Sequence, residues 1–157
     1  MRIGSGYDAH RLVFGRSLVL GGVEIPFEKG LQGHSDADVL THAVCDALLG
    51  ALGLGDLGGH FPDTSEEFKD IRSIQLLERC CRLMLDKGFK LVNLDATLYA
   101  QAPKIAPYRH EMERHLAQAL HTPIDNVNVK ATTTEGLGFI GAGEGMAAQC
   151  VVLIDDV

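Results

Sequence analysis

The first stretch of the sequence places a carboxylate and an imidazole two positions apart. Asp8 and His10 lie in "MRIGSGYDAHRL", and residues 1–10 have the pattern of a β-strand. Residues i and i+2 of a strand project from the same face, with backbones roughly 7 Å apart. Both side chains could therefore reach one metal ion, because bonds from zinc to His N or Asp O measure about 2.0–2.2 Å. A pair of surface residues that binds no metal would show the same spacing, so a metal site is indicated only if the chain supplies a third ligand.

A third candidate ligand, His42, lies in a predicted helix. The segment "HSDADVLTHAVCDALLGALG", residues 34–53, has helical periodicity, and Asp38 and Asp46 each lie four positions from His42. A spacing of four puts all three on one helical face. A histidine between carboxylates is typical of a metal ligand with orienting partners, although a solvated polar stripe would look similar. Together, Asp8, His10 and His42 would make a His2Asp set with an open fourth position, as in catalytic zinc sites.

A second chemical signal follows a predicted strand near the C-terminus. In "ATTTEGLGFIGAGEG", Gly136, Gly138 and Gly141 match G-x-G-x-x-G, but another strand follows, so the pattern is not a dinucleotide fingerprint. The hydroxyl and backbone N–H groups of residues 132–134 could hold phosphate oxygens. Glu135 could hold a hard cation such as Mg²⁺ together with substrate phosphates. The alternative is a threonine-rich strand end with glycines at a bend.

The elements that must position these residues alternate between strand and helix patterns. We predict an α+β fold with a single mixed sheet, helices packed on one face and a small β-hairpin. The predicted strands are residues 1–10, 91–101, 126–134 and 146–156, with a hairpin over 17–27. The predicted helices are residues 34–53, with Ser35 or Asp36 as N-cap, residues 71–87, and a third opened by Pro103 that carries Ile105, Tyr108, Met112 and Leu116. Residues 54–70 and 136–145 are predicted loops.

The last predicted strand is apolar on both of its faces. Met146, Ala148, Cys150 and Val152 alternate with Ala147, Val151 and Leu153. A strand that is apolar on both sides needs cover on both. The helices supply one layer, so we expect another subunit to supply the second.

Composition excludes several classes of protein. The chain has 157 residues and a net charge of −7, and no cluster of Lys and Arg argues for a nucleic-acid partner. No apolar run approaches the ~20 residues of a membrane span, and no secretory signal pattern begins the chain. The four cysteines, at positions 45, 80, 81 and 150, form no C-x-x-C pair. We therefore expect reduced thiols and a cytoplasmic protein.

Four ordered segments carry a resemblance to a known family. They are "RIGSGYDAHRL", "GGVEIPFEKGLQGHSDADVLTHAVCDALLGALGLGDLGGHFPD", "AQAPKIAPY" and "NVNVKATTTEGLGFIGAGEG". The chain resembles the 2-C-methyl-D-erythritol 2,4-cyclodiphosphate synthase family of the non-mevalonate isoprenoid pathway nearly end to end. The resemblance implies that residues 1–157 form one such domain. It also implies a homotrimer, assembled around the sheets, with active sites at the subunit interfaces.

The resemblance also implies cofactors and site residues. It implies one zinc per chain, held by Asp8, His10 and His42, and a magnesium or manganese ion at Glu135 that bridges the substrate diphosphate. His34 and Thr133 match positions that stabilise the transition state. The implied substrate-binding positions on the metal side are Asp8, Ala9, His10, His34, Ser35, Asp56, Leu57, Gly58, Phe61, Pro62, Asp63, Thr64 and Ser65. Those implied on the cytidine side are Ala100, Gln101, Ala102, Pro103, Lys104, Ile105, Ala106, Thr132, Thr133, Thr134, Glu135 and Phe139.

Two positions depart from the pattern of this family. Many relatives have histidine in place of Ser5 and arginine in place of Ala142. In some relatives that arginine helps an inner cavity of the trimer to hold an isoprenoid diphosphate, so this property is not carried over. Neither departure touches the predicted metal ligands.

The implied reaction is an intramolecular phosphoryl transfer. The 2-phosphate of a cytidine diphosphate ester of methylerythritol attacks the β-phosphorus, a cyclic diphosphate forms, and CMP leaves. A metal-dependent phosphohydrolase with the same ligands is one alternative, distinguished by an uncyclised product. A trimeric, non-enzymatic module that holds a structural metal is another, although structural zinc normally has four protein ligands.

Overall fold

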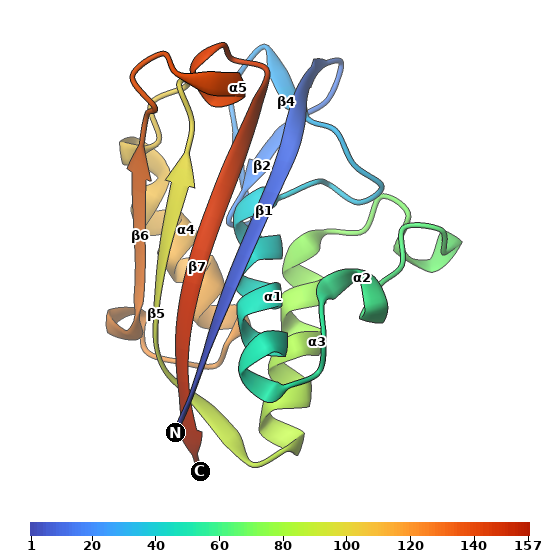
Figure 1. Ribbon diagram of the computed structural model, residues 1–157, viewed down its shortest axis with the longest axis vertical. Coiled ribbons are helices and arrows are strands. Elements are labelled where there is room, and N and C mark those ends of the chain that lie inside the picture. Colours follow the sequence, from blue (N-terminus) through green and yellow to red (C-terminus); the bar gives the residue numbers. More distant parts are fainter.

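A five-stranded mixed sheet forms one layer of the protein in the computed structural model, which describes residues 1–157 (Figure 1). From edge to edge the strands are β4 (Lys29–Leu31), β1 (Arg2–Phe14), β7 (Gly145–Asp156), β5 (Phe89–Tyr99) and β6 (Val127–Thr132). β5 and β6 run parallel, and every other neighbouring pair is antiparallel. The predicted mixed sheet is therefore confirmed.

Three longer helices cover one face of this sheet. In Figure 1, α4 (Arg109–Ala119) lies behind β5 and β7, and α1 (Val39–Leu52) and α3 (Ser73–Asp86) lie to the right of β1. α1 contacts β1, β7 and β5. No helix reaches the length and apolar character that a membrane crossing requires. The predicted α+β class, with helices on one face of the sheet, is confirmed.

The remaining elements are short. β2 (Leu18–Leu20) and β3 (Val23–Ile25) pair as the predicted hairpin. The predicted loop over residues 54–70 contains a helical turn, α2 (Leu57–His60), and a 3-10 turn, η1 (Glu66–Phe68). The predicted glycine-rich loop likewise contains one helical turn, α5 (Gly138–Gly141). Two further 3-10 turns flank α4: η2 (Ala106–Tyr108) precedes it and η3 (Ile124–Asn126) follows it.

The core lies between the sheet and α1. On β7, alternate residues from Met146 to Ile154 face the helices and are fully buried. α1 is buried nearly all round, because β1 and β7 lie on one side of it and α3 on the other. This packing fixes α1 against the strand that carries Asp8 and His10.

The opposite face of the sheet has no helical cover. Ile3 and Tyr7 on β1 are 71% and 59% exposed, and Val151 on β7 is 38% exposed. Ile3 pairs with Leu153 in the sheet register, so these apolar side chains form adjacent columns. The second layer expected over β7 is not part of this chain, and its supply by another subunit stays a prediction.

Two predicted helix starts are wrong. α1 begins at Val39 with Asp38 as its N-cap, in place of the predicted Ser35 or Asp36. The preceding Ala37 has a φ of +56°, which a right-handed helix does not allow. Pro103 does not open the third helix either: α4 starts at Arg109, and the proline of the preceding 3-10 turn is Pro107.

A β-bulge changes one predicted strand face. Regular alternation along the predicted strand 91–101 would put Val92 on the same side as Leu94, but Val92 is 36% exposed, whereas Leu91 is buried. The register of β5 on β7 shifts between Leu91 and Asn93, so one extra residue separates the two inward-facing leucines. β4 was not predicted, and β1 extends beyond residue 10 to Phe14.

Candidate active site

Two glycines let α1 approach β1 closely enough to build the site. Gly4 and Gly6 face α1, and a Cβ atom on them would lie 1.9 Å from the carbonyl oxygen of Ala47 and 2.0 Å from that of Ala43. Only glycine leaves room for the helix backbone at that distance. Asp8 and His10 lie two and four residues after Gly6, so their side chains project from the same face of the strand. The sequence G-x-G-x-D-x-H therefore brings both side chains beside α1.

His42 on α1 meets Asp8 and His10, as predicted. Asp8 Oδ2 lies 2.8 Å from His10 Nε2 and 3.0 Å from His42 Nδ1, and the two histidine nitrogens are 3.2 Å apart. A tetrahedral zinc ion would hold such atoms about 3.3–3.6 Å apart, given its bond lengths. The donor set thus fits a divalent ion after a shift of a few tenths of an ångström. No fourth His, Cys, Asp or Glu joins this cluster.

The charges of the cluster are strongly coupled. Burial raises the pKa of the Asp8 carboxyl, but hydrogen bonds from His10 and His42, together with the charges of these imidazoles, outweigh burial and lower that pKa to about 2. Burial lowers the pKa of His10, whereas the hydrogen bond to Asp8 and the negative charge of Asp8 leave that pKa raised above its ordinary value. Without a metal, hydrogen bonds between Asp8 and the two imidazoles hold the three ligand atoms close together.

Asp38 and Asp46 do not orient His42, contrary to the expectation from their spacing. The fully buried Asp38 carboxylate accepts hydrogen bonds from the backbone of Gly21 and Gly22 and from the backbone and hydroxyl of Thr41. Asp46 accepts a 2.7 Å hydrogen bond from the backbone of Leu57. Both aspartates therefore tie α1 to neighbouring segments.

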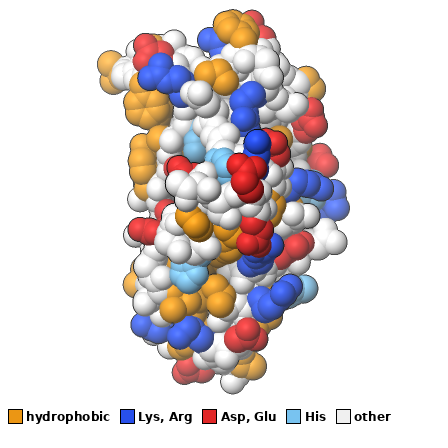
Figure 2. All heavy atoms as spheres, turned by 90° about the vertical axis from the view of Figure 1, so that its right-hand side faces the viewer, with side chains coloured by type: hydrophobic (Ala, Val, Ile, Leu, Met, Phe, Trp, Pro, Cys, Tyr) orange, Lys and Arg blue, Asp and Glu red, His pale blue; other side chains and the backbone are white.

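A cavity of about 580 Å³ opens onto the metal cluster. On this side of the molecule, histidine and acidic side chains lie close together in the upper half of the view (Figure 2). Most of the residues implied on the metal side line the cavity together with Asp46 and Phe68: Asp8, His10, His34, Ser35, His42, Asp56, Leu57, Gly58, Phe61, Pro62 and Asp63. Ala9, Thr64 and Ser65 do not line it; Ala9 is exposed on the opposite face of β1.

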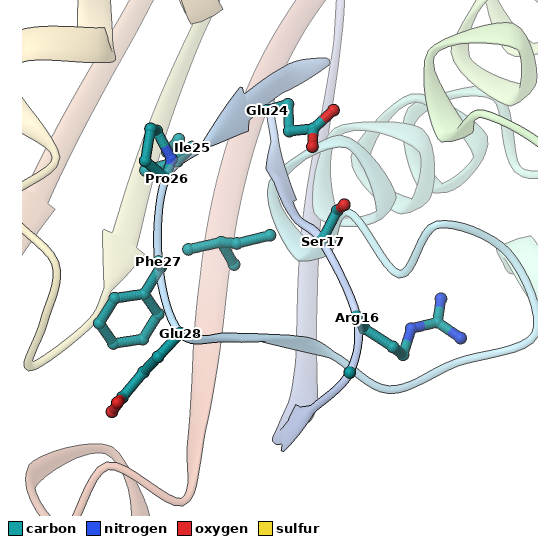
Figure 3. A pocket seen from close by; sticks show the side chains of 9 residues that line it. Arg16, Ser17, Glu24, Ile25, Pro26, Phe27 and Glu28 are labelled. Carbon is teal, nitrogen blue, oxygen red and sulfur yellow. The ribbon is translucent and has the colours of Figure 1, made fainter.

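The loop that carries His34 is held from two sides. His34 Nε2 lies 2.8 Å from the carbonyl oxygen of Ser65, to which it donates. Arg16 donates to the carbonyl oxygens of Gly33 and Ser35 at 3.1 Å and 2.6 Å. In Figure 3 the Arg16 side chain extends from the turn after β1 toward the segment that leads to α1. Arg16 thus fixes the backbone on both sides of His34, a contact that the sequence did not predict.

The pocket in Figure 3 is a separate feature. It has a volume of about 660 Å³ and lies at the hairpin, away from the metal cluster. Its charged side chains, Arg16, Glu24 and Glu28, point in different directions (Figure 3). No group of polar atoms converges on one point, so this larger cavity is not the candidate site.

The residues implied on the cytidine side form a second pocket of about 490 Å³. Residues 100–106, Thr132 and Thr133 line it with Ala131 and Arg109, at the ends of β5 and β6. These strands lie on the far side of β7 from β1, so one chain carries the two pockets in different places (Figure 1). The resemblance implies active sites at subunit interfaces, and within a single chain the two sets of residues form separate pockets.

Glu135, Thr134 and Phe139 line neither pocket. Glu135 is exposed and has a φ of +54°, an uncommon conformation for a residue other than glycine. Gln101 accepts a 3.3 Å hydrogen bond from the backbone of Gly136, which joins this turn to the wall of the second pocket. Glu135 therefore borders the second pocket and does not join the Asp8 cluster.

Comparison with known proteins points to one activity. A profile of the YgbB family matches residues 1–155. The chain is 64% identical over 155 residues to the 2-C-methyl-D-erythritol 2,4-cyclodiphosphate synthase of Desulfatibacillum aliphaticivorans, covering 99% of this chain and 100% of that one. The bifunctional IspDF from Campylobacter jejuni has a TM-score of 0.96 at 43% identity, over 99% of this chain and 42% of that one. A solved cyclodiphosphate synthase in a CDP-bound form has a TM-score of 0.90 at 40% identity, over 98% of this chain and 100% of that one.

Proposed function

The chain belongs to the YgbB family, and on this premise we propose that it converts 4-diphosphocytidyl-2-C-methyl-D-erythritol 2-phosphate to 2-C-methyl-D-erythritol 2,4-cyclodiphosphate and CMP. The curated relatives support a cyclodiphosphate synthase function in isoprenoid biosynthesis. The observation that carries the proposal is the three-ligand cluster of Asp8, His10 and His42 at an open cavity. The enzyme class we propose is a phosphorus-oxygen lyase that acts within one domain, residues 1–157.

The donor set supports zinc as the ion held by Asp8, His10 and His42. Two imidazoles and a carboxylate are ligands that catalytic zinc sites use, and the absence of a fourth protein ligand leaves a position for substrate. The same absence disfavours a structural metal module. We propose that Glu135 holds magnesium or manganese, which prefers carboxylate and phosphate oxygens. When bound, both ions would stabilise negative charge on the diphosphate oxygens.

The residues of the chain contribute mainly positioning. The nucleophile, the 2-phosphate, is already an anion, so no strong general base is required. Its attachment to the same molecule makes the attack unimolecular, which is worth roughly 7–11 kcal/mol when the atoms are well oriented. His34 and Thr133 are the side chains that we propose to stabilise the transition state. The wall formed by Phe61 and Phe68 would exclude water, which would otherwise divert the reaction to hydrolysis.

We propose that each active site joins the two pockets of neighbouring subunits in a homotrimer. Two observations support this arrangement. The two pockets are separated within one chain, and the apolar sheet face around Ile3, Tyr7 and Val151 is uncovered. The nucleotide of the CDP-bound relative is consistent with a cytidine nucleotide substrate for the second pocket. The four cysteines are buried and unpaired, which supports the proposed cytoplasmic location.

Formation of the cyclic diphosphate together with CMP from 4-diphosphocytidyl-2-C-methyl-D-erythritol 2-phosphate, the cytidylyl bisphosphate, tests the function, and a subunit mixture tests the shared site. His42→Ala damages the metal pocket and Thr133→Val damages the second pocket, so each homotrimer should be inactive. When the two variants are mixed at random, about three quarters of the trimers contain both of them. Each of these trimers has one of its three sites built from two intact halves, so about a quarter of wild-type turnover should return. A mixture as inactive as its parents would contradict a site shared between subunits.

A further inference from the structure

The two ring nitrogens of His42 have different surroundings. Nδ1 faces the metal cluster, 3.0 Å from Asp8 Oδ2 and 3.2 Å from His10 Nε2. Nε2 points away from the cluster and lies 2.8 Å from the hydroxyl oxygen of Ser73, with the Ser35 hydroxyl farther away at 3.3 Å. Ser73 is the first residue of α3 and is completely buried. A buried hydroxyl therefore contacts the side of His42 that does not face the metal.

Asp36 determines the direction of the hydrogen bonds in this chain of side chains. Its Oδ2 accepts from the backbone of Ser73 at 3.0 Å, and its Oδ1 accepts from the backbone of Asp38 at 3.2 Å. The Ser73 hydroxyl also bonds to Asp36 Oδ1. A carboxylate can only accept, so the single hydroxyl proton of Ser73 is donated to Asp36. The lone pair of the hydroxyl then accepts a hydrogen bond from His42 Nε2.

We propose that Ser73 and Asp36 are positioning residues that hold a proton on His42 Nε2 and orient the ring, so that Nδ1 faces the metal position and is the nitrogen that a bound metal would take. This inference rests on the proposed metal site. His10 has a matching arrangement, because its Nδ1 lies 2.8 Å from the carbonyl oxygen of Gln32, which only accepts. Both imidazoles are thereby oriented with their other ring nitrogen toward Asp8.

The relay is built into the contact between two loops. Asp36 donates its backbone N–H to the carbonyl oxygen of Ile71 at 3.1 Å, and the backbone carbonyl oxygen of His34 accepts from the backbone N–H of Asp70 at 2.9 Å. These bonds join the loop before α1 to the loop before α3, so the position of Ser73 relative to His42 is fixed by backbone as well as by side chains. Arg72, the N-cap residue of α3, makes no side-chain cap bond, and Asp36 satisfies the Ser73 N–H in its place.

The test is zinc affinity and histidine protonation in Ser73→Ala, with Ser17→Ala as a matched control. Ser17 is exposed and lies at the hairpin pocket. The Ser73→Ala change removes the hydroxyl but keeps the N–H that Asp36 caps. Loss of a hydrogen-bond partner behind a metal-bound histidine typically weakens metal binding 10–100-fold. We expect that loss in a competition with a chelator for Ser73→Ala, and none for Ser17→Ala.

Nitrogen NMR of the histidine rings provides the second readout. In the wild-type protein without metal, His42 Nε2 should carry a proton that is hydrogen-bonded to Ser73, whatever the state of Nδ1, and Ser73→Ala should lose that hydrogen bond. A merely structural serine would lower thermal stability and leave both the Nε2–H signal and the zinc affinity unchanged, which would overturn the proposal. A wild-type protein whose His42 Nε2 carries no proton would overturn it too, even if Ser73→Ala failed to fold. A protein that shows the hydrogen-bonded Nε2–H but binds no zinc would contradict the proposed function and leave the relay standing.

Discussion

Replacing Gly6 with alanine should separate α1 from β1 and destroy the metal cluster. The new Cβ would lie 2.0 Å from the carbonyl oxygen of Ala43 and 2.7 Å from the amide nitrogen of Ala47. Carbon makes ordinary contacts at about 3.5 Å, so the helix has to move by at least ~1 Å. Overpacking of this kind costs about 3 kcal/mol when backbone must shift. The same displacement would lengthen the 3.0 Å contact between His42 Nδ1 and Asp8 Oδ2 beyond hydrogen-bond distance.

Gly50→Ala is the matched control, because it makes the same substitution on α1 where there is space. A Cβ on Gly50 meets only the carbonyl oxygen of Ser5, at 3.7 Å. Alanine at a helical position stabilises by roughly 0.5–1 kcal/mol relative to glycine. At one protein concentration, thermal unfolding should show a Tm about 6–12 °C lower for Gly6→Ala and a slightly higher Tm for Gly50→Ala. A Gly6→Ala protein with wild-type Tm and zinc content would refute the close-packing argument.

Three further perturbations test the metals and the assembly. Glu135→Gln should keep zinc, lose ~10²–10³ in turnover and recover part of that turnover at high Mg²⁺. CMP release measured across a Mg²⁺ titration tests this, and near-normal turnover at low Mg²⁺ would contradict it. In sedimentation experiments, Val151→Asp should convert a species of three chains into monomers that keep zinc but do not convert substrate, whereas Val157→Asp, at the exposed C-terminus, should leave the assembly intact. A trimeric Val151→Asp protein would contradict the proposed interface. Because Asp8 raises the pKa of His10, zinc has to displace a proton below that pKa. Zinc affinity should therefore be constant above it and fall by up to about tenfold per pH unit below it; an affinity independent of pH would contradict the assignment.

Local patterns in the sequence predicted the elements and the metal triad. The alternation in β1 and β7 and the helical period of α1 are properties of neighbouring residues, so they could be read without tertiary contacts. Asp8 and His10 share a strand face for the same reason. Their meeting with His42 could not be read in this way, although Gly4 and Gly6 on the same face were a signal of close helix packing.

The errors concern residues whose partners are distant in the sequence. Asp38 and Asp46 have the same spacing from His42, but they bind the backbone of Gly21 and Gly22 and of Leu57. Asp36 was predicted only as a possible N-cap, but it binds Ser73. No spacing rule connects Ser73 to His42, which is 31 residues away, so the relay behind the histidine was missed. The capping choice at α1 and the bulge at Val92 likewise depend on how segments meet, not on their own composition.

Cyclisation and hydrolysis differ in the origin of one oxygen atom, and that difference tests the central claim. The protein should be incubated with the cytidylyl bisphosphate, zinc and Mg²⁺ in ¹⁸O-labelled water, and the products analysed by phosphorus NMR and mass spectrometry. Attack by the 2-phosphate forms the new P–O bond within the substrate, so the account predicts a cyclic diphosphate and CMP without ¹⁸O in either product. An uncyclised bisphosphate or a CMP that carries ¹⁸O would show that water is the nucleophile and would contradict the proposed function.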